Sequence, residues 1–145
     1  CAFVSSERIE FCVNNSVVLI DSDNRFFTEY RKHLSGKGQP GIGDLFFKWL
    51  WDNQYNTARV RQISITAIEQ PKMFYEFPDD SDLMIFDSDD RMFVAVAVSA
   101  GTEAVIVNSV DSDYEKCREA LKRHGVAVEE LCPDMVRRKL KSDRR

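Results

Sequence analysis

Short apolar runs alternate along the chain with segments whose apolar side chains recur at helical spacing. The run 16–20 predicts a buried strand that ends at Asp21, and residues 60–66 alternate apolar and polar positions as a half-buried strand does. Residues 104–107 and 126–128 predict two further short buried strands. Because strands separated by helices tend to pair in parallel, this order favours an α/β fold with helices on both sides of its sheet.

Helical spacing marks four other segments. Residues 24–34, 44–52 and 90–100 predict helices, and an amphipathic helix over 113–124 is expected to stop at Gly125. Such spacing gives each helix one apolar face to set against a sheet. The second helix is expected to turn four side chains inward: Leu45, Phe46, Trp49 and Leu50.

The length of the chain bounds its organisation. With 145 residues, it is expected to form a single domain with one core over residues 1–145. The segment 70–82 contains Pro71 and breaks the periodicity, so it is interpreted as a long connection or lid. A basic tail follows at about 134–145.

Charge is unevenly distributed along the chain. Residues 134–145 hold six Lys or Arg against two Asp, so a net charge of −4 divides into +4 for this tail and −8 for the rest. An acidic body argues against a protein that grips nucleic acid mainly by neutralising the backbone. It is compatible with an enzyme whose bound metal ions face a phosphate.

The cysteines and the apolar runs bear on location. No 18-residue apolar run and no basic-then-apolar leader is present, so neither a membrane span nor secretion is expected. No C-x-x-C pair occurs, and only two histidines are available, which argues against a zinc site. We therefore expect a cytoplasmic protein whose four cysteines are free thiols: Cys1, Cys12, Cys117 and Cys132.

Three short acidic clusters stand out, at 21–23, 87–90 and 111–113. The first and third follow predicted strands, so Asp21 and Asp111 are expected at the sheet edge where ligands of parallel sheets bind. Helix capping is the alternative interpretation, because Asp and Ser are favoured at helix N-termini. Two carboxylates about 5.5 Å apart repel by roughly 3 kcal/mol at an effective dielectric of about 20. Several carboxylates gathered in one pocket therefore favour a hard dication such as Mg²⁺ or Mn²⁺.

Two segments resemble the PIN-domain nuclease family. Residues 90–97 read as an aspartate that opens an alanine-rich helix, and Gly101, a strand and Asp111 at its end follow. The segment 17–21 is similar to the family's first strand and first acid. The resemblance covers about residues 15 to 132, and the more specific part is the block from 90 to 114.

The resemblance implies a three-layer α/β/α sandwich with a central, mostly parallel sheet. It also implies an Mg²⁺- or Mn²⁺-dependent ribonuclease that cleaves RNA phosphodiester bonds, of the kind that serves as the toxin of a toxin–antitoxin pair. An antitoxin protein and a second copy of the chain are the implied partners. The family's second acid is a Glu near the start of a helix, where this chain has Asp44, with Glu29 as the competitor. The implied catalytic acids are Asp21, Asp44, Asp90 and Asp111, with Asp21, Asp90, Asp111 and Asp113 as metal ligands and Arg25, Lys48 and Arg91 as substrate-binding residues.

Two other functions stay open at this point. A haloacid-dehalogenase-like phosphatase is suggested by a strand followed by D-x-D, with Asp23 as general acid, although that family has Thr or Val where Arg25 stands. The other alternative is a PIN-like fold that has lost catalysis and serves as an interaction module. This chain has Asp44 where the family has a Glu, and that difference keeps this alternative open.

Overall fold

The structure is a computed structural model that describes residues 1–70 and 72–144. Pro71 of the predicted connection and Arg145 of the basic tail lie outside the described residues. The chain divides into two compact units: Ala2–Ser64, called the N-terminal unit, and Ile65–Arg145 together with Cys1, called the C-terminal unit. Both units are mixed α/β, and each contains one sheet of two short strands. The expectation of a single domain stays a prediction.

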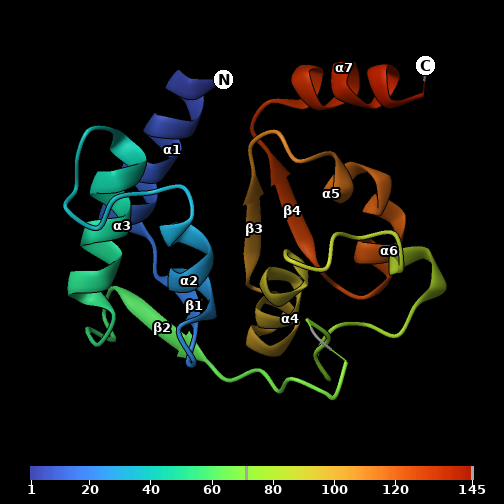
Figure 1. The fold of residues 1–145 in the computed structure, drawn as a ribbon, viewed down its shortest axis with the longest axis horizontal. Coiled ribbons are helices and arrows are strands. Elements are labelled where there is room, and N and C mark those ends of the chain that lie inside the picture. Colours follow the sequence, from blue (N-terminus) through green and yellow to red (C-terminus); the bar gives the residue numbers. More distant parts are fainter. Residues whose placement is uncertain (71, 145) are drawn as a thin grey trace. The chain divides into compact units, whose positions relative to one another are not determined.

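The N-terminal unit is built around a parallel pair of strands. Its elements are α1 (Ala2–Asn15), β1 (Val18–Asp21), α2 (Arg25–Arg31), α3 (Ile42–Asn53) and β2 (Val60–Ile63). β1 and β2 pair in parallel from Val18 opposite Val60 to Asp21 opposite Ile63. Helix α2 packs on β1 and on α3, and α1 packs on α3 (Figure 1). The strand predicted to end at Asp21 is confirmed.

Aromatic side chains form the core of the N-terminal unit. The ring of Phe27 meets those of Phe47 and Trp51 edge-on, at centroid distances of 5.8 and 5.0 Å. The predicted inward face of the second helix is confirmed at Leu50, which is fully buried, and wrong at Leu45, which is 54% exposed while Phe47 is 2% exposed. Buried positions recur every three residues along α3, and they place Asp44 on the buried face.

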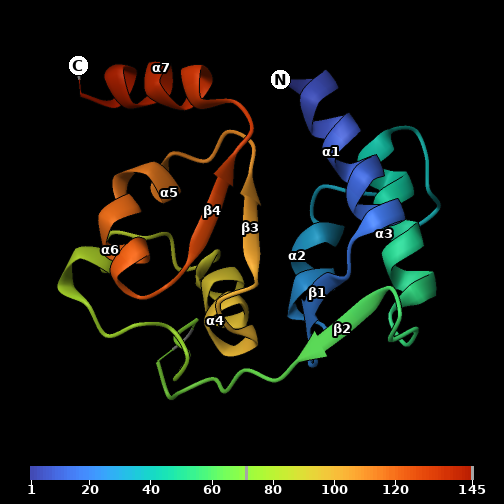
Figure 2. The ribbon, with the colours of Figure 1, turned by 180° about the vertical axis from the view of Figure 1, so that it is seen from behind.

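The C-terminal unit contains the second parallel pair. Its elements are the 3₁₀ turn η1 (Ser81–Leu83), α4 (Arg91–Ala100), β3 (Val105–Asn108), α5 (Ser112–Lys116), α6 (Arg118–Arg123), β4 (Ala127–Glu130) and α7 (Pro133–Asp143). Strands β3 and β4 pair from Val105 opposite Ala127 to Asn108 opposite Glu130. Helix α4 packs on β3, and α5 packs on both α6 and α7 (Figure 2).

Three features of the C-terminal unit differ from expectation. The helix predicted over 113–124 is interrupted at Cys117, although Gly125, with a φ of +74°, ends it as predicted. The predicted basic tail is mostly helix α7. β3 was expected to be buried, yet Val105 and Val107 are 52% and 38% exposed.

The cysteines are not all free thiols as predicted. Cys1 and Cys132 form a disulfide with their Cα atoms 5.8 Å apart, whereas Cys12 and Cys117 are free. Disulfides persist mainly in oxidising compartments, so this bond contradicts the argument from cysteines for a reducing one. The cytoplasmic location stays a prediction. Among the described residues, no helix has the length and apolar character needed to span a bilayer.

Candidate functional site

Asp21 is fixed at the end of β1 by backbone hydrogen bonds. Its carboxylate accepts the N–H groups of Asp23, Arg25 and Phe26 at 3.1, 2.9 and 2.9 Å. The chain reaches this geometry by turning through Asn24, which has a positive φ of 61°. The side chain is fully buried. Asp21 therefore orders the start of α2, which is the capping role that its sequence position also allowed.

Two groups near Asp21 respond to its charge. Burial, with a smaller contribution from the Asp21 carboxylate, raises the pKa of Tyr30 to about 12. Arg25 lies 3.6 Å from Asp21 and donates to Asp23 at 2.8 Å. The Arg25 guanidinium is thus partly neutralised by these two acids. Its predicted contact with substrate stays a prediction.

The two candidates for the second acid have different surroundings. Asp44 is buried, and its carboxylate accepts the backbone N–H groups of Ser35 at 2.5 Å and of Gly41 at 2.8 Å. These two hydrogen bonds lower the pKa of Asp44 below its usual value. Glu29 instead accepts from Lys32 at 2.6 Å. Of the two candidates, Asp44 is therefore the carboxylate that is held more firmly in place. Lys48, a predicted substrate-binding residue, pairs with Asp52 at 2.5 Å.

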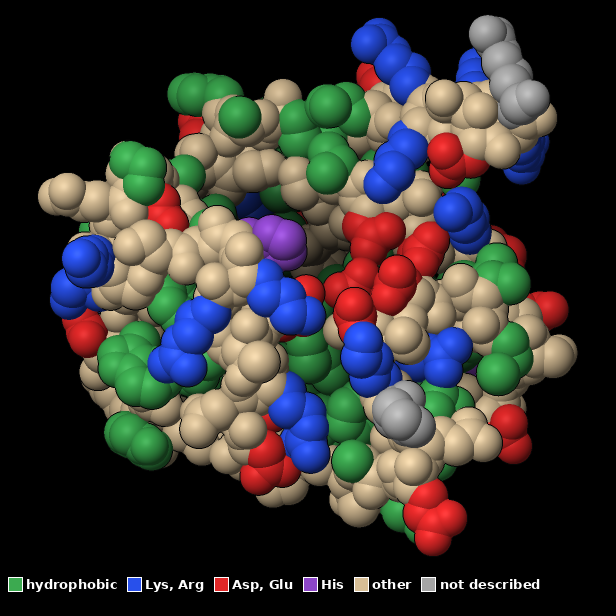
Figure 3. Space-filling view, in the orientation of Figure 1, with side chains coloured by type: hydrophobic (Ala, Val, Ile, Leu, Met, Phe, Trp, Pro, Cys, Tyr) green, Lys and Arg blue, Asp and Glu red, His purple; other side chains and the backbone are tan. Residues whose placement is uncertain are grey.

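The second and third acidic clusters meet in the C-terminal unit. The backbone N–H of Asp87 donates to Asp113 Oδ2 at 2.9 Å, across 26 residues of chain. Asp111 accepts the N–H of Asp113 at 2.9 Å and so caps α5. Asp90 precedes α4 and makes no side-chain capping hydrogen bond there. Figure 3 shows acidic side chains gathered on the part of this unit that carries α5.

Glu130 is a member of this acidic group that the sequence analysis missed. It is the last residue of β4 and lies opposite Asn108, the last residue of β3. The Asn108 amide donates to Glu130 at 2.8 Å and to the Asp111 carbonyl at 2.7 Å, and its oxygen accepts the Asp111 N–H. The rule that ligands collect at the carboxyl ends of parallel strands would have found it. The strand predicted over 126–128 ended two residues before β4, which ends at Glu130.

The carboxylates around Glu130 act on one another. Burial is the main cause that raises the pKa of Glu130, and the carboxylates of Glu115 and Asp111 raise it further. The hydrogen bond from Asn108 and the charge of Arg118 act in the opposite direction. Glu130, Glu115 and Asp111 are therefore close enough to repel, which is the electrostatic condition that a bound dication relieves.

Glu130→Gln is expected to raise the melting temperature at pH 7 in EDTA. The folded-state pKa of Glu130 lies above its ordinary value of 4.5, so the folded state holds the proton more tightly than the unfolded state. Stability then falls as pH rises from about 4.5 through the folded pKa, and glutamine removes that penalty. Thermal melts from pH 4 to pH 8 should show the gain at pH 7 and its disappearance at pH 4. Exposed Glu119→Gln is the matched control, and a lower melting temperature for Glu130→Gln at pH 7 would refute the repulsion.

The side chain of Arg91 contacts the segment that precedes α4. Its guanidinium donates to the carbonyl oxygens of Phe86 and Met84, each at 3.2 Å, and lies over the ring of Phe77 at 5.4 Å. Hydrogen bonds from a charged donor are stronger than neutral ones. Arg91 therefore holds the segment that precedes α4. Substrate binding by Arg91 stays a prediction.

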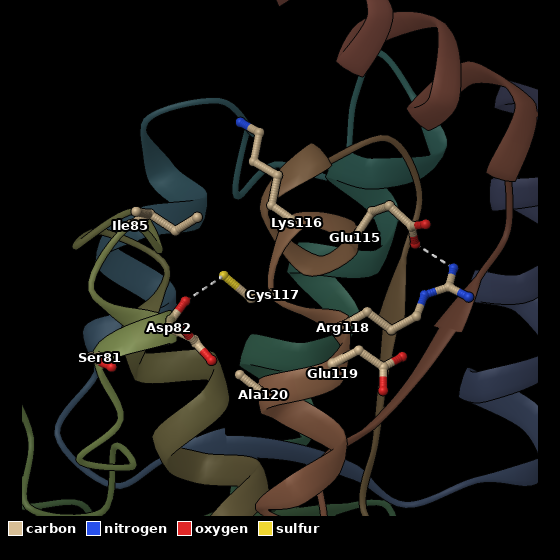
Figure 4. A pocket seen from close by; sticks show the side chains of 9 residues that line it. All are labelled: Ser81, Asp82, Ile85, Glu115, Lys116, Cys117, Arg118, Glu119 and Ala120. Atoms are coloured by element: carbon tan, nitrogen blue, oxygen red, sulfur yellow. Dashed lines mark hydrogen bonds and ion pairs between the residues drawn. The ribbon is translucent and has the colours of Figure 1, made fainter.

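A pocket of about 500 Å³ lies between η1 and the α5–α6 pair (Figure 4). The thiol of Cys117 points into this region and contacts the Asp82 carbonyl at 3.6 Å, and Glu115 pairs with Arg118 at the rim. Burial raises the pKa of Cys117, and the charge of Asp113 raises it further. None of the four predicted catalytic acids lines this pocket.

The predicted acids are divided between the two units. Asp21 and Asp44 belong to the N-terminal unit, and Asp90, Asp111 and Asp113 to the C-terminal unit. Within residues 1–70 and 72–144, no group of three or more His, Cys, Asp or Glu side chains is arranged to hold a metal ion. Comparison with protein-family models, curated proteins and solved structures finds no match to the chain.

Proposed function

We propose that this chain is an Mg²⁺- or Mn²⁺-dependent endoribonuclease with a PIN-like fold. The observation that supports this most is the meeting of two acidic segments from distant parts of the C-terminal unit, through the hydrogen bond from Asp87 to Asp113. Glu130 adds a carboxylate whose pKa is raised mainly by burial and further by the charges of Glu115 and Asp111. Crowded carboxylates at the ends of parallel strands are the arrangement in which a dication is stabilising.

The proposal includes a single central sheet built from both strand pairs. Both pairs are parallel, and parallel strands are ordinarily covered on both faces by helices. The exposed valines of β3, Val105 and Val107, are the apolar surface that such a sheet would cover.

The donor atoms in these segments suit Mg²⁺ or Mn²⁺. All are carboxylate oxygens, which are the ligands that hard cations prefer. Asp21, Asp90 and Asp111 would hold the ion, Asp113 would support it, and Asp44 would complete the site. When bound, the ion would supply Lewis-acid stabilisation of the charge on the scissile phosphate.

The chain's own residues supply positioning. Three backbone N–H groups fix Asp21, and the cap of α5 fixes Asp111, so neither carboxylate has to be ordered when substrate arrives. Arg25 and Lys48 would contact the phosphates of the strand. Hydrolysis adds water across the phosphodiester bond and leaves a 5′-phosphate and a 3′-hydroxyl.

A cleavage assay with a metal titration tests the proposal. A 5′-labelled single-stranded RNA should be cut with Mn²⁺ and remain intact in EDTA. Mn²⁺ at about one hundred times its dissociation constant should raise the free energy of unfolding by about 2.7 kcal/mol. Exposed Glu119→Gln should cut and bind as the unchanged chain does.

Two other outcomes would reject the nuclease. If millimolar Mn²⁺ neither supports cleavage nor stabilises the fold, the chain is an interaction module. If a small phosphate monoester is hydrolysed instead of RNA, and Asp23→Asn abolishes that activity, the chain is a phosphatase of the D-x-D type.

A further inference from the structure

Helix α7 concentrates positive charge on an otherwise acidic chain. The described part of the segment from Asp134 carries five Lys or Arg side chains, all exposed: Arg137, Arg138, Lys139, Lys141 and Arg144. At 3.6 residues per turn, four of them share one side of the helix and only Lys139 points elsewhere. This cationic face, defined as Arg137, Arg138, Lys141 and Arg144, extends about 10 Å along the helix axis. Figure 3 shows basic side chains gathered around α7.

Among the residues that the structure describes, most of the cationic face has no acidic partner. Arg137 pairs with Asp134 at 3.5 Å. Across the part of the chain that the structure describes, no ion pair occupies Arg138, Lys141 or Arg144. Each of these three charges is therefore available to an external anion.

The other side of α7 is already used within the unit. Val136 is 2% exposed, Leu140 is half-buried, and α7 packs on α5. Met135, 48% exposed, is the one large apolar side chain of α7 that is exposed to this degree among the described residues. A helix that binds a bilayer inserts an apolar face, and α7 keeps none free for that purpose. A soluble polyanion fits this surface better than a membrane does.

α7 also lies beside the proposed catalytic acids. Its neighbour α5 starts at the cap residue Asp111 and carries Asp113 in its first turn. Lys116 connects the two, because its ammonium lies 3.2 Å from Asp113 and 4.0 Å from Asp143 near the end of α7. The cationic face lies on the side of α7 away from α5, so a strand bound there would have to cross over α7 before a neighbouring phosphate reached the acids.

We infer that the cationic face of α7 is a docking surface for the phosphate backbone of single-stranded RNA. This inference rests on the proposed function and names the element that holds its substrate. Arginine is suited to this role, because its guanidinium bonds two phosphate oxygens at once. Contacts of this kind release counterions, so binding should weaken as salt rises.

The test is RNA binding measured in EDTA, where no cleavage is expected. Fluorescence anisotropy with a labelled 12-nucleotide polyuridine should show affinity falling with salt. Three phosphate contacts imply a loss of roughly 20-fold between 50 and 200 mM salt. The triple variant Arg138→Gln, Lys141→Gln, Arg144→Gln should lose this dependence, with the slope shallower by about 2. Glutamine preserves helix propensity, and an unchanged melting temperature would show that the variant folds.

A control with the same change in net charge isolates the position of the charges. Lys37→Gln, Arg61→Gln and Lys122→Gln remove three exposed cations elsewhere and should leave the slope unchanged. Equal losses in both triple variants, or no loss in the α7 variant, would overturn the inference. So would an α7 variant that loses sedimentation with phosphatidylserine vesicles while its RNA binding is kept. Cleavage with Mn²⁺ is scored separately, so binding without cleavage would reject the nuclease and not the docking surface.

Discussion

Asp111→Asn is expected to reduce Mn²⁺-dependent RNA cleavage by at least about 100-fold while leaving the fold intact. Loss of a residue that merely orients a metal ligand lowers activity by about 10- to 100-fold, so loss of a ligand itself should have at least that effect. Asparagine keeps an oxygen that accepts the Asp113 N–H, the hydrogen bond by which Asp111 caps α5. The substitution therefore removes the charge and preserves the cap.

Initial cleavage rates and thermal melts of the same preparation measure the two effects. In EDTA, the Asp111→Asn melting temperature should equal or exceed that of the unchanged chain, since one repulsive neighbour of Glu130 is lost. Asp111→Ala removes the cap as well and should lower stability by about 1 kcal/mol. Cleavage that persists in Asp111→Asn would show that Asp111 only caps α5, and would end its catalytic assignment.

Reduction of the Cys1–Cys132 disulfide is expected to lower the free energy of unfolding by roughly 2–5 kcal/mol. The bond joins residues 131 positions apart, so it restricts the unfolded chain over nearly its whole length. The entropy removed from the unfolded state grows with the size of the closed loop, which places the expected loss toward the upper end of that range. Urea unfolding with and without a reductant measures it.

The remaining cysteines provide the matched control. Cys12→Ser leaves the disulfide in place and should lose stability on reduction as the unchanged chain does. Cys1→Ser should be destabilised already and should not respond to the reductant. An unfolding midpoint that is the same in both redox conditions would show that the bond does not stabilise the fold.

Elements with a simple local pattern were predictable from the sequence. The short apolar run before Asp21 favoured a strand, and β1 forms there with Ile20 and Asp21 as its buried residues. The alanine-rich segment that forms α4 and the stop at Gly125 were equally clear. Gly125 adopts a positive φ that other residues avoid, so its sequence position carries structural meaning.

Elements decided by tertiary packing were not predictable in detail. Helix α3 contains apolar side chains on several sides, so the sequence does not show that Phe47 rather than Leu45 is buried. Nothing in the sequence marks Cys117 as the break between α5 and α6. α1 has no buried residue, so it lacks the apolar face by which an amphipathic helix is recognised.

The candidate site was predictable in part for the same reason. Three acidic clusters are visible in the sequence, but which of them meet depends on the paths of the intervening segments. The hydrogen bond from Asp87 to Asp113 joins two of them across a helix and a strand. Glu130 requires the register of β4 against β3, which pairs it with Asn108. Because the strand predicted over 126–128 ends two residues before β4 does, the prediction did not include Glu130.

The position of Arg91 has a consequence for the motion of the acidic group. Between Ser64 and α4, the chain contains one short 3₁₀ turn and an isolated bridge as its regular structure in the described residues. Segments of this kind open locally at a lower free energy than the core does. The hydrogen bonds from Arg91 to the carbonyl oxygens of Phe86 and Met84 oppose that opening. When these bonds break, Asp87 moves away from Asp113. Amide exchange at Asp87 would then be faster than in β3, and the geometry of the acids would fluctuate with it.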